Sequence, residues 1–310
     1  MIYFTNKFVK FFFKNLGIFL GWILPKTEIS RFSVSLSDNV YVLKNDSLGD
    51  MVILLYVLRE IDPLNKFSIL TSKNVNIKLC NILSPERSVF KLSTLFFLKN
   101  LFLRRKNTVI SGRTYPFCYG PLSFVLSSSS IGYRSDGLGS FFKTLLPCSK
   151  YKNQYRLLYD NFDKYFFSVT NYIPTHKVKK SIEFNLSDLM SYLKLKKSII
   201  ISPFASQPSK FISTRFISML LNSFDGEIVF LNSETMLVSE YYANLSFDNH
   251  ISCQLADLPS VLNSFDVCIS SDSFVAHLSN FLNLDVIQVF KDNNFREWCV
   301  PNNFFYRDLN

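Results

Sequence analysis

Short runs of β-branched and aromatic residues alternate with segments of helical periodicity along most of this chain, and this alternation constrains its fold more than any other feature. It is typical of βα units that build a parallel sheet. In the first half the expected elements are strand 40–43, helix 50–61, strand 67–70, helix 90–103, strand 108–110 and a helix near 158–170. A polar and basic stretch at 175–180 then separates the two halves.

The alternation restarts in the second half. Residues 198–201 read as a nearly all-apolar strand, as expected where both faces of a parallel sheet are covered. The further elements expected are helix 211–222, strand 228–231, helix 235–245, helix 258–264, strand 267–269, helix 274–282 and strand 286–289. We therefore predict an α/β protein with two doubly wound domains that face each other. Ligands bind beyond the carboxyl ends of the strands in such sheets, so the loops after positions 43, 201, 231 and 269 are the candidate sites.

The loop after the first strand runs from Lys44 to Asp50 and leads directly into a helix. Gly49 permits a tight turn with a close approach of the backbone, and Asp50 is expected at or near the N-cap of the helix. A structural role is enough to explain an aspartate at position 50, because its carboxylate can cap the helix by accepting hydrogen bonds from backbone amides. A catalytic role for Asp50 therefore needs support from elsewhere in the chain.

Two loops in the second half supply such support. Residues 202–210 form a small-residue loop that ends in Lys210 before a helix, so that backbone amides, the helix dipole and an ammonium group converge as a diphosphate would require. Residues 270–277 follow another strand and open another helix, where Asp272 and Ser273 stand beside amide donors and His277 lies about one turn further on. A lone histidine of this kind is usually structural, so only the combination indicates a site.

In their order and separation these motifs resemble those of glycosyltransferase family 9, the heptosyltransferases that build the inner core of lipopolysaccharide. The resemblance runs from about residue 40 to residue 292. The residues that carry it are Lys44, Leu48-Gly49-Asp50, Val52 and Leu58-Arg59 in the first signature, Ile131-Gly132-Tyr133 in a turn, Ile199–Ser202, Ala205-Ser206, Lys210 and Arg215-Phe216 in the middle signature, and Asp272-Ser273, His277-Leu278 and Val286–Phe290 in the late one.

The sequence also departs from the family pattern. Phe274 stands where the family has glycine, Tyr56 replaces a frequent proline, and Asn232 and Ser233 replace the usual glycines. Phe274 brings a bulky side chain to a point where backbone would approach the donor. The alternative function is therefore that of a degenerate relative, which binds a glycolipid or nucleotide without transferring a sugar.

The resemblance implies two Rossmann-like domains of the GT-B type that face a cleft, an acceptor domain at 31–178 and a donor domain at 179–310. It implies inverting, metal-independent transfer of heptose or a related sugar from an ADP-heptose-like donor to the lipopolysaccharide core or another lipid-linked acceptor, without a cofactor. Asp50 would be the general base, and Lys210 would balance the charge of the departing diphosphate. The other residues implied are Ser206, Glu234, Asp272, Ser273 and His277 on the donor side and Lys44 and Gly49 on the acceptor side.

Residues 1–30 are expected to contain an amphipathic helix that lies in a membrane interface. Its apolar run, 11–24, is interrupted by a lysine and closed by Pro25, so it is shorter than the roughly 20 residues that a spanning helix needs. Separate apolar and basic faces are typical of a helix among anionic headgroups. A helix packed on the protein and a secretory signal are the alternatives, although no small-x-small cleavage site follows. The apolar face would hold Phe4, Phe8, Phe11, Phe12, Ile18, Phe19 and Trp22, and the basic face Lys7, Lys10 and Lys14.

Charge is unevenly divided between the two halves. Residues 1–180 carry 26 basic and 10 acidic side chains, whereas residues 181–310 carry 8 and 14. The positive half predicts an anionic partner, which we interpret as a phosphorylated glycolipid on the cytoplasmic surface of the inner membrane. The basic residues are dispersed and no nucleic-acid-binding motif accompanies them, which disfavours a nucleic acid.

The spacing of the cysteines limits the kinds of site that this chain can contain. The six of them stand far apart, with no C-x-x-C pair and no histidine at ligand spacing. This pattern argues against a zinc site and against a dense disulfide framework, and it fits a reducing compartment. We interpret all six as small buried hydrophobic residues.

Overall fold

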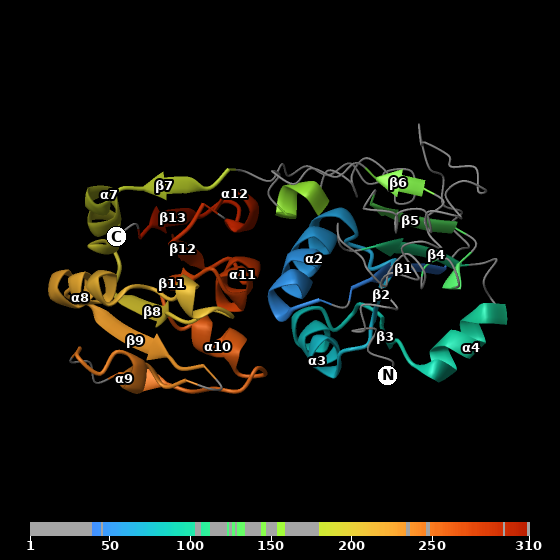
Figure 1. Ribbon diagram of the computed structural model, residues 1–310, viewed down its shortest axis with the longest axis horizontal. Helices are drawn as coiled ribbons and strands as arrows, with labels where there is room; N and C mark the ends of the chain where they lie inside the picture. The colour runs from blue at the N-terminus through green and yellow to red at the C-terminus, as the bar shows by residue number, and fades with distance from the viewer. Residues whose placement is uncertain are drawn as a thin grey trace. The chain divides into compact units, whose positions relative to one another are not determined.

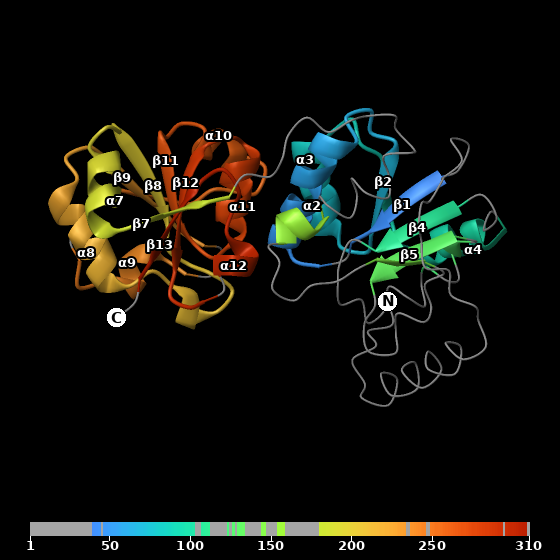
Figure 2. The same cartoon turned by 90° about the horizontal axis from the view of Figure 1, so that it is seen from above.

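A computed structural model of the chain describes residues 39–44, 46–102, 107–111, 123, 126–127, 129–133, 144–146, 154–158, 180–233, 236–245, 249–293 and 295–308. The expected helix within 1–30 and most of the one near 158–170 lie outside these residues. The chain forms two compact units (Figures 1 and 2). The second unit contains Leu48–Tyr56 and Tyr151–Arg156 in addition to Lys177–Asn310, so helix α2 (Leu48–Ile61) is divided between the two.

The first unit contains a six-stranded sheet in the order β3-β2-β1-β4-β5-β6, and all neighbouring strands are parallel. This is the strand order of a Rossmann fold. Tyr41, Leu43, Leu70, Val109 and Leu126 form a buried cluster in this unit. The strands are β1 (Asn39–Leu43), β2 (Phe67–Thr71), β3 (Val89–Lys91), β4 (Asn107–Ser111), β5 (Ser129–Tyr133) and β6 (Thr144–Leu146).

Two helices of the first unit differ from the sequence prediction. Helix α3 (Asn74–Leu83) was not predicted, because its asparagines interrupt the apolar period. The helix expected at 90–103 is α4 (Thr94–Phe102), since Val89–Lys91 pairs with β2 as an edge strand instead. The hydroxyl of Ser93 accepts a hydrogen bond from the Phe96 amide at 3.1 Å, which fixes the start of α4.

The second unit contains a seven-stranded parallel sheet in the order β10-β9-β8-β11-β12-β13-β7. Three of these strands, β7, β10 and β13, were not predicted, because each has only two to four residues. The strands are β7 (Ile182–Phe184), β8 (Ser198–Ser202), β9 (Glu227–Leu231), β10 (His250–Ile251), β11 (Val267–Ser271), β12 (Asp285–Phe290) and β13 (Phe304–Arg307).

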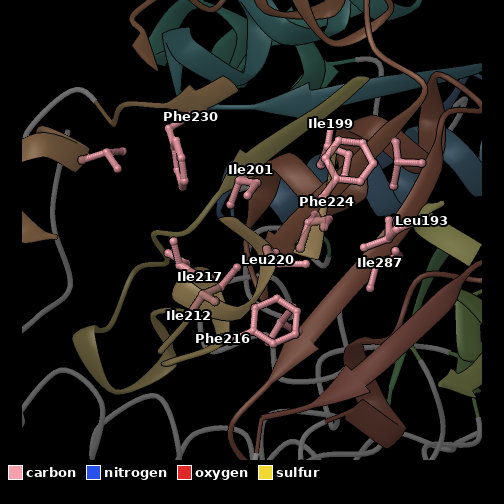
Figure 3. Close-up of a cluster of buried hydrophobic side chains, with 14 of the residues drawn as sticks. Leu193, Ile199, Ile201, Ile212, Phe216, Ile217, Leu220, Phe224, Phe230 and Ile287 are labelled. Carbon is pink, nitrogen blue, oxygen red and sulfur yellow. The ribbon is translucent and has the colours of Figure 1, made fainter. Parts of the chain in front are cut away.

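The core of the second unit lies between its sheet and helix α8 (Thr214–Ser223) (Figure 3). Phe216, Ile217 and Leu220 recur at helical spacing on α8 and pack against Ile199 and Ile201 of β8. Burial of one such side chain stabilises the fold by about 1.5–3 kcal/mol. The other helices are α7 (Leu186–Leu193), the 3-10 turn η3 (Pro208–Lys210), α9 (Val238–Tyr241), α10 (Leu258–Leu262), α11 (Phe274–Phe281) and α12 (Phe295–Trp298).

Side chains accept hydrogen bonds at the starts of two helices of the second unit. Ser213 caps α8 by accepting from the Phe216 amide at 3.1 Å, so the helix expected at 211–222 begins at Thr214. Of the helix expected at 235–245, the described residues show α9 (Val238–Tyr241), and Asn232 accepts a hydrogen bond from the Val238 amide at 2.8 Å where it begins. No helix among the described residues is long and apolar enough to cross a membrane.

Candidate functional site

The loops after β8 and β11 meet at the carboxyl edge of the second sheet. These two strands are parallel neighbours, so both end at the same edge. Ser271 donates a hydrogen bond from its hydroxyl to the Phe204 carbonyl at 2.7 Å, which ties the loops together. Ser270 and Ser273 share a hydrogen bond of 3.0 Å between their hydroxyls. Because the Ser273 hydroxyl bonds to Ser270, it does not cap α11 although Ser273 is the N-cap residue, and the amides of the first turn of α11 keep their donor capacity.

An ion pair joins the two loops at this edge. Lys210 Nζ, at the end of η3, lies 2.5 Å from Asp272 Oδ2, just before α11. Their side chains are 22% and 9% exposed. Gln288, fully buried on β12, donates to Asp272 Oδ1 at 3.3 Å and accepts from the Val300 amide at 3.0 Å. Asp272 therefore accepts a hydrogen bond from Gln288 of the sheet through one carboxylate oxygen and pairs with the Lys210 ammonium group through the other.

His277 lies one turn into α11 and is buried. Its Nδ1 is 2.9 Å from the hydroxyl of Tyr155. Burial lowers the pKa of His277 below its ordinary value of 6.5 and Lys210 acts in the same direction, whereas the charges of Asp272 and Asp50 raise it. The net shift is downward, so the imidazole is neutral near neutral pH.

The start of α2 packs against α11 within the second unit. A Cβ placed on Gly49 would lie 3.2 Å from His277 Cδ2 and 3.6 Å from Phe274 Cα, so glycine permits this close approach. Asp50 stands in the first turn of α2, where a carboxylate is favoured by the helix dipole. Its side chain is partly exposed, and its charge acts on His277. The arrangement combines a carboxylate, an ammonium group and a helix N-terminus.

The chain resembles known proteins in its three-dimensional structure. No protein-family model and no curated protein matches the chain. E. coli heptosyltransferase WaaC with ADP matches with a TM-score of 0.59 and 15% identity, over 86% of this chain and 90% of that one. The glycosyl transferase family 9 structure from Veillonella parvula DSM 2008 matches with 0.64 and 11%, over 91% and 90%. E. coli ADP-heptose LPS heptosyltransferase II matches with 0.57 and 12%, over 86% and 89%.

This chain has the fold of the heptosyltransferases. The match confirms the predicted α/β class with two Rossmann-like domains of the GT-B type, and it agrees with the resemblance to glycosyltransferase family 9 that the motifs carry. At 11–15% identity the likeness is one of fold, so the roles of individual residues remain predictions.

Within the heptosyltransferase fold, six of the nine predicted site residues lie in the second unit as one group. They are Gly49, Asp50, Lys210, Asp272, Ser273 and His277. Lys44 is buried in the first unit, where it pairs with Asp46 at 3.1 Å. Ser206 is exposed in the loop between β8 and η3, and Glu234 lies outside the described residues.

Two residues beside this group were missed by the sequence prediction. Gln288 could have been recognised from the sequence, because a polar side chain stands out inside the otherwise apolar, buried strand β12. Tyr155 could not be recognised in this way, since its segment, 154–158, lies more than a hundred residues from His277.

Within the described parts of the chain, no cluster of three or more His, Cys, Asp or Glu side chains could hold a metal. Four described cysteines are free thiols, and burial raises the pKa of Cys80, Cys268 and Cys299 to about 12. At neutral pH these three thiols stay protonated, as predicted for small buried hydrophobic residues. Cys253 is only partly buried, contrary to the prediction, and Cys118 and Cys148 lie outside the described residues.

Proposed function

We propose that this chain is a glycosyltransferase of family 9, which transfers heptose or a related sugar from an ADP-heptose-like donor to a lipid-linked acceptor with inversion and without a metal. One observation carries the proposal: Asp50, the Lys210–Asp272 pair and the start of α11 come together in one unit of a heptosyltransferase fold. The solved structure of E. coli WaaC with ADP-2-deoxy-2-fluoro heptose also supports it, with a TM-score of 0.60 at 13% identity.

The acceptor side of the reaction needs a base. As the acceptor hydroxyl oxygen forms a bond to the anomeric carbon, Asp50 takes its proton, and the bond between that carbon and the phosphate oxygen breaks on the opposite face. A carboxylate in the first turn of α2 is rigidly placed, because the helix backbone fixes it and Gly49 packs closely on α11. General base catalysis of this kind contributes typically 10²–10⁴-fold.

The donor side needs positive charge for the departing diphosphate. Lys210 supplies it, and Asp272 holds the ammonium group in place at 2.5 Å. The first amides of α11, after Ser273, and the ring of His277 add hydrogen-bond donors. Ser206 and Glu234 remain proposed donor contacts.

Phe274 supports the second candidate function. It is the first residue of α11, partly exposed, and its Cα lies beside Gly49. A side chain there narrows the space in which a sugar diphosphate would approach the amides of α11. A binding protein without transfer is the function this residue would favour. Calorimetry with ADP and a panel of nucleotide-sugars, followed by a transfer assay, separates the two functions.

We further propose that the first unit faces the acceptor and the inner surface of the membrane, and that the donor domain is 179–310 and the acceptor domain 31–178. The surface of α4 supports this proposal: Leu95 is 77% and Leu98 51% exposed, and Lys99 on the same helix is exposed as well. Apolar side chains together with a lysine suit an anionic lipid surface. Residues 1–30 and Lys44 remain proposed parts of this side.

The decisive experiment replaces Asp50 by Asn, which removes the base and keeps its shape. We expect loss of sugar transfer to deacylated or intact lipopolysaccharide acceptors, with ADP binding retained by calorimetry. Asp188→Asn is the matched control, because Asp188 also lies in the first turn of a helix, α7, and is exposed. Near-normal turnover by the Asp50 variant would contradict its role as base.

A further inference from the structure

Tyr155 is a buried side chain beside the proposed site to which the mechanism assigns no role. It is fully buried, and its ring makes an edge contact with Tyr56 at 5.2 Å between centroids. Its hydroxyl lies 2.9 Å from Nδ1 of His277. A hydrogen bond between a phenol and a neutral imidazole can run in either direction. The direction decides which ring nitrogen of His277 carries the proton.

A chain of hydrogen-bonded amides orients the side chain of Asn280, which lies on α11 as His277 does. It begins at the Val286 backbone amide, which can only donate and bonds to Asn303 Oδ1 at 2.8 Å. The amide group of Asn303 is thereby oriented, and its Nδ2 donates to Asn280 Oδ1 at 2.7 Å. Asn280 is oriented in turn, so that its Nδ2 is the atom left for other contacts. Each step starts from a group that can only donate, and Asn303 Nδ2 also donates to the Pro301 carbonyl at 3.2 Å.

The Tyr155 hydroxyl keeps its own proton. Burial raises its pKa well above the ordinary value, and the side chain of Asn280 acts on it in the opposite direction to a smaller extent. Asn280 Nδ2 is buried and has no hydrogen-bond partner among the described residues. Within the same residues, the hydroxyl of Tyr155 has its hydrogen bond to Nδ1 of His277. The phenol proton is therefore left for Nδ1 of His277.

We infer that Tyr155 is a positioning residue, which holds His277 as the tautomer protonated on Nε2. With Nδ1 accepting from Tyr155, the Nε2–H group is on the other side of the ring. There it lies 3.9 Å from the position of a Cβ on Gly49, close to the start of α2. This inference rests on the proposed function for its consequence: an N–H at this point donates to a phosphate oxygen, whereas a lone pair would repel it.

The tautomer can be measured without any enzymatic assay. The chain has only three histidines, His176, His250 and His277, so ¹⁵N-histidine labelling gives a spectrum that single substitutions of the other two would assign. Long-range ¹H–¹⁵N correlations distinguish the two tautomers. We expect His277 to be protonated on Nε2 in the intact protein. Protonation on Nδ1 would overturn the inference, whether or not the protein transfers a sugar.

Two substitutions test the cause. Tyr155→Phe keeps the ring and removes the hydroxyl, and we expect a mixture of tautomers. Asn280→Asp is nearly isosteric and presents an acceptor to the phenol, and we expect the Tyr155 proton to turn toward it and His277 to become protonated on Nδ1. An unchanged His277 pattern in a folded Tyr155→Phe protein would show that Tyr155 does not set the tautomer. If that variant does not fold, the Asn280 variant and the wild-type spectrum decide.

The effect of Tyr155 on nucleotide binding can be measured separately. We expect Tyr155→Phe to weaken ADP binding about tenfold, the order of one hydrogen bond to a charged group. Tyr56→Phe is the matched control, because its ring packs on Tyr155 while its hydroxyl accepts from Asn302 at 3.3 Å. A tautomer set as inferred together with unchanged ADP binding would refute the contact between His277 and the diphosphate but leave the positioning role intact. Failure of the wild-type protein to bind any nucleotide would refute the proposed function instead.

Discussion

Two ion pairs in this chain have the same length and opposite surroundings. Arg87 and Asp62 in the first unit approach to 2.5 Å, as Lys210 and Asp272 do in the second. The first pair is almost completely buried, with side chains 2% and 0% exposed. Asp62 also accepts from the amides of Lys66 and Phe67, both at 2.9 Å. Its partner Arg87 donates to the carbonyls of Phe67, Leu58 and Asp62.

The difference indicates what each pair does. The Arg87–Asp62 pair uses its hydrogen-bonding capacity to join the end of α2 to the start of β2 and the approach to β3, which is a structural role. Lys210 is 22% exposed and lies beside the first turn of a helix, and Asp272 is its ion-pair partner among the described residues. An ammonium group has three donors, so Lys210 retains capacity for an anionic ligand. The proposed function places an anionic ligand at the pair in the second unit.

Arg87→Met should have the largest effect on stability. It leaves the Asp62 carboxylate buried without its cation, and breaking a buried pair in this way costs about 3–5 kcal/mol. The measurement is denaturant unfolding. Arg307→Met is the control, because Arg307 pairs with Glu183 at the surface, with side chains 39% and 41% exposed, and such pairs contribute about 0–1 kcal/mol. Equal losses in the two variants would contradict a structural role specific to the buried pair.

Lys210→Met should have the reverse profile. Because Lys210 is partly exposed, we expect a stability change below about 1 kcal/mol. Transfer should fall about 10²–10³-fold, as when one preorganised charge-stabilising group is removed. Lys196→Met is the matched control, since Lys196 is also 22% exposed and pairs with an aspartate, Asp285, at 2.8 Å. If both lysine variants lose activity equally, the special role of Lys210 is refuted.

The same contrast explains how much could be predicted from the sequence. The strands β1, β8 and β11 and the loops that follow them were predicted, because long apolar runs and small-residue loops are local signals. The ion pair between Lys210 and Asp272 was not predicted. It became evident only from the sheet topology, in which β8 and β11 are parallel neighbours and their loops meet at one edge. The Arg87–Asp62 pair was not predicted, since a buried arginine looks like any surface arginine in a sequence.

The remaining errors have physical causes of the same kind. The helix expected at 90–103 began too early, because Val89–Lys91 is as apolar as a helix segment but pairs as an edge strand. Tyr155 could not be predicted to contact His277, because the contact depends on how the segment 154–158 packs rather than on any local pattern. Long-range side-chain contacts are decided by packing, whereas loops and strands are decided locally.

Gly49→Ala tests the close packing behind the charged pair. Its Cβ would lie 3.2 Å from His277 Cδ2, and the hydrogen bond to Tyr155 limits how far the ring can move. We expect sugar transfer to fall while stability changes by less than about 1 kcal/mol, since alanine is the better helix former by about that amount. Gly226→Ala is the opposite case: its Cβ would lie 2.5 Å from the Lys197 carbonyl, so it should destabilise the protein. A Gly49→Ala variant that lost stability but kept normal transfer, or a Gly226→Ala variant that kept its stability, would contradict these predictions.

His277 should give the smallest effect, a dependence of stability on pH. Burial, the main cause, lowers its pKa in the folded protein below the ordinary value of 6.5 that it regains on unfolding. The unfolded chain therefore binds the proton more readily, so stability rises with pH through this window and is lost as pH falls from about 6.5 toward the folded pKa. Replacing His277 by Gln removes this contribution to the pH dependence of stability.

The measurement is the free energy of unfolding of both proteins at about pH 7.5 and about pH 5.5. We expect the wild type to lose more stability on acidification than the His277→Gln variant. The charges of Asp272 and Asp50 oppose the effect of burial, so their influence can be tested by the same comparison in an Asp50→Asn background, where the pH-dependent loss should grow. A wild type that gained stability on acidification relative to the variant would mean that His277 is charged in the folded protein, and that the site holds two cations instead of one.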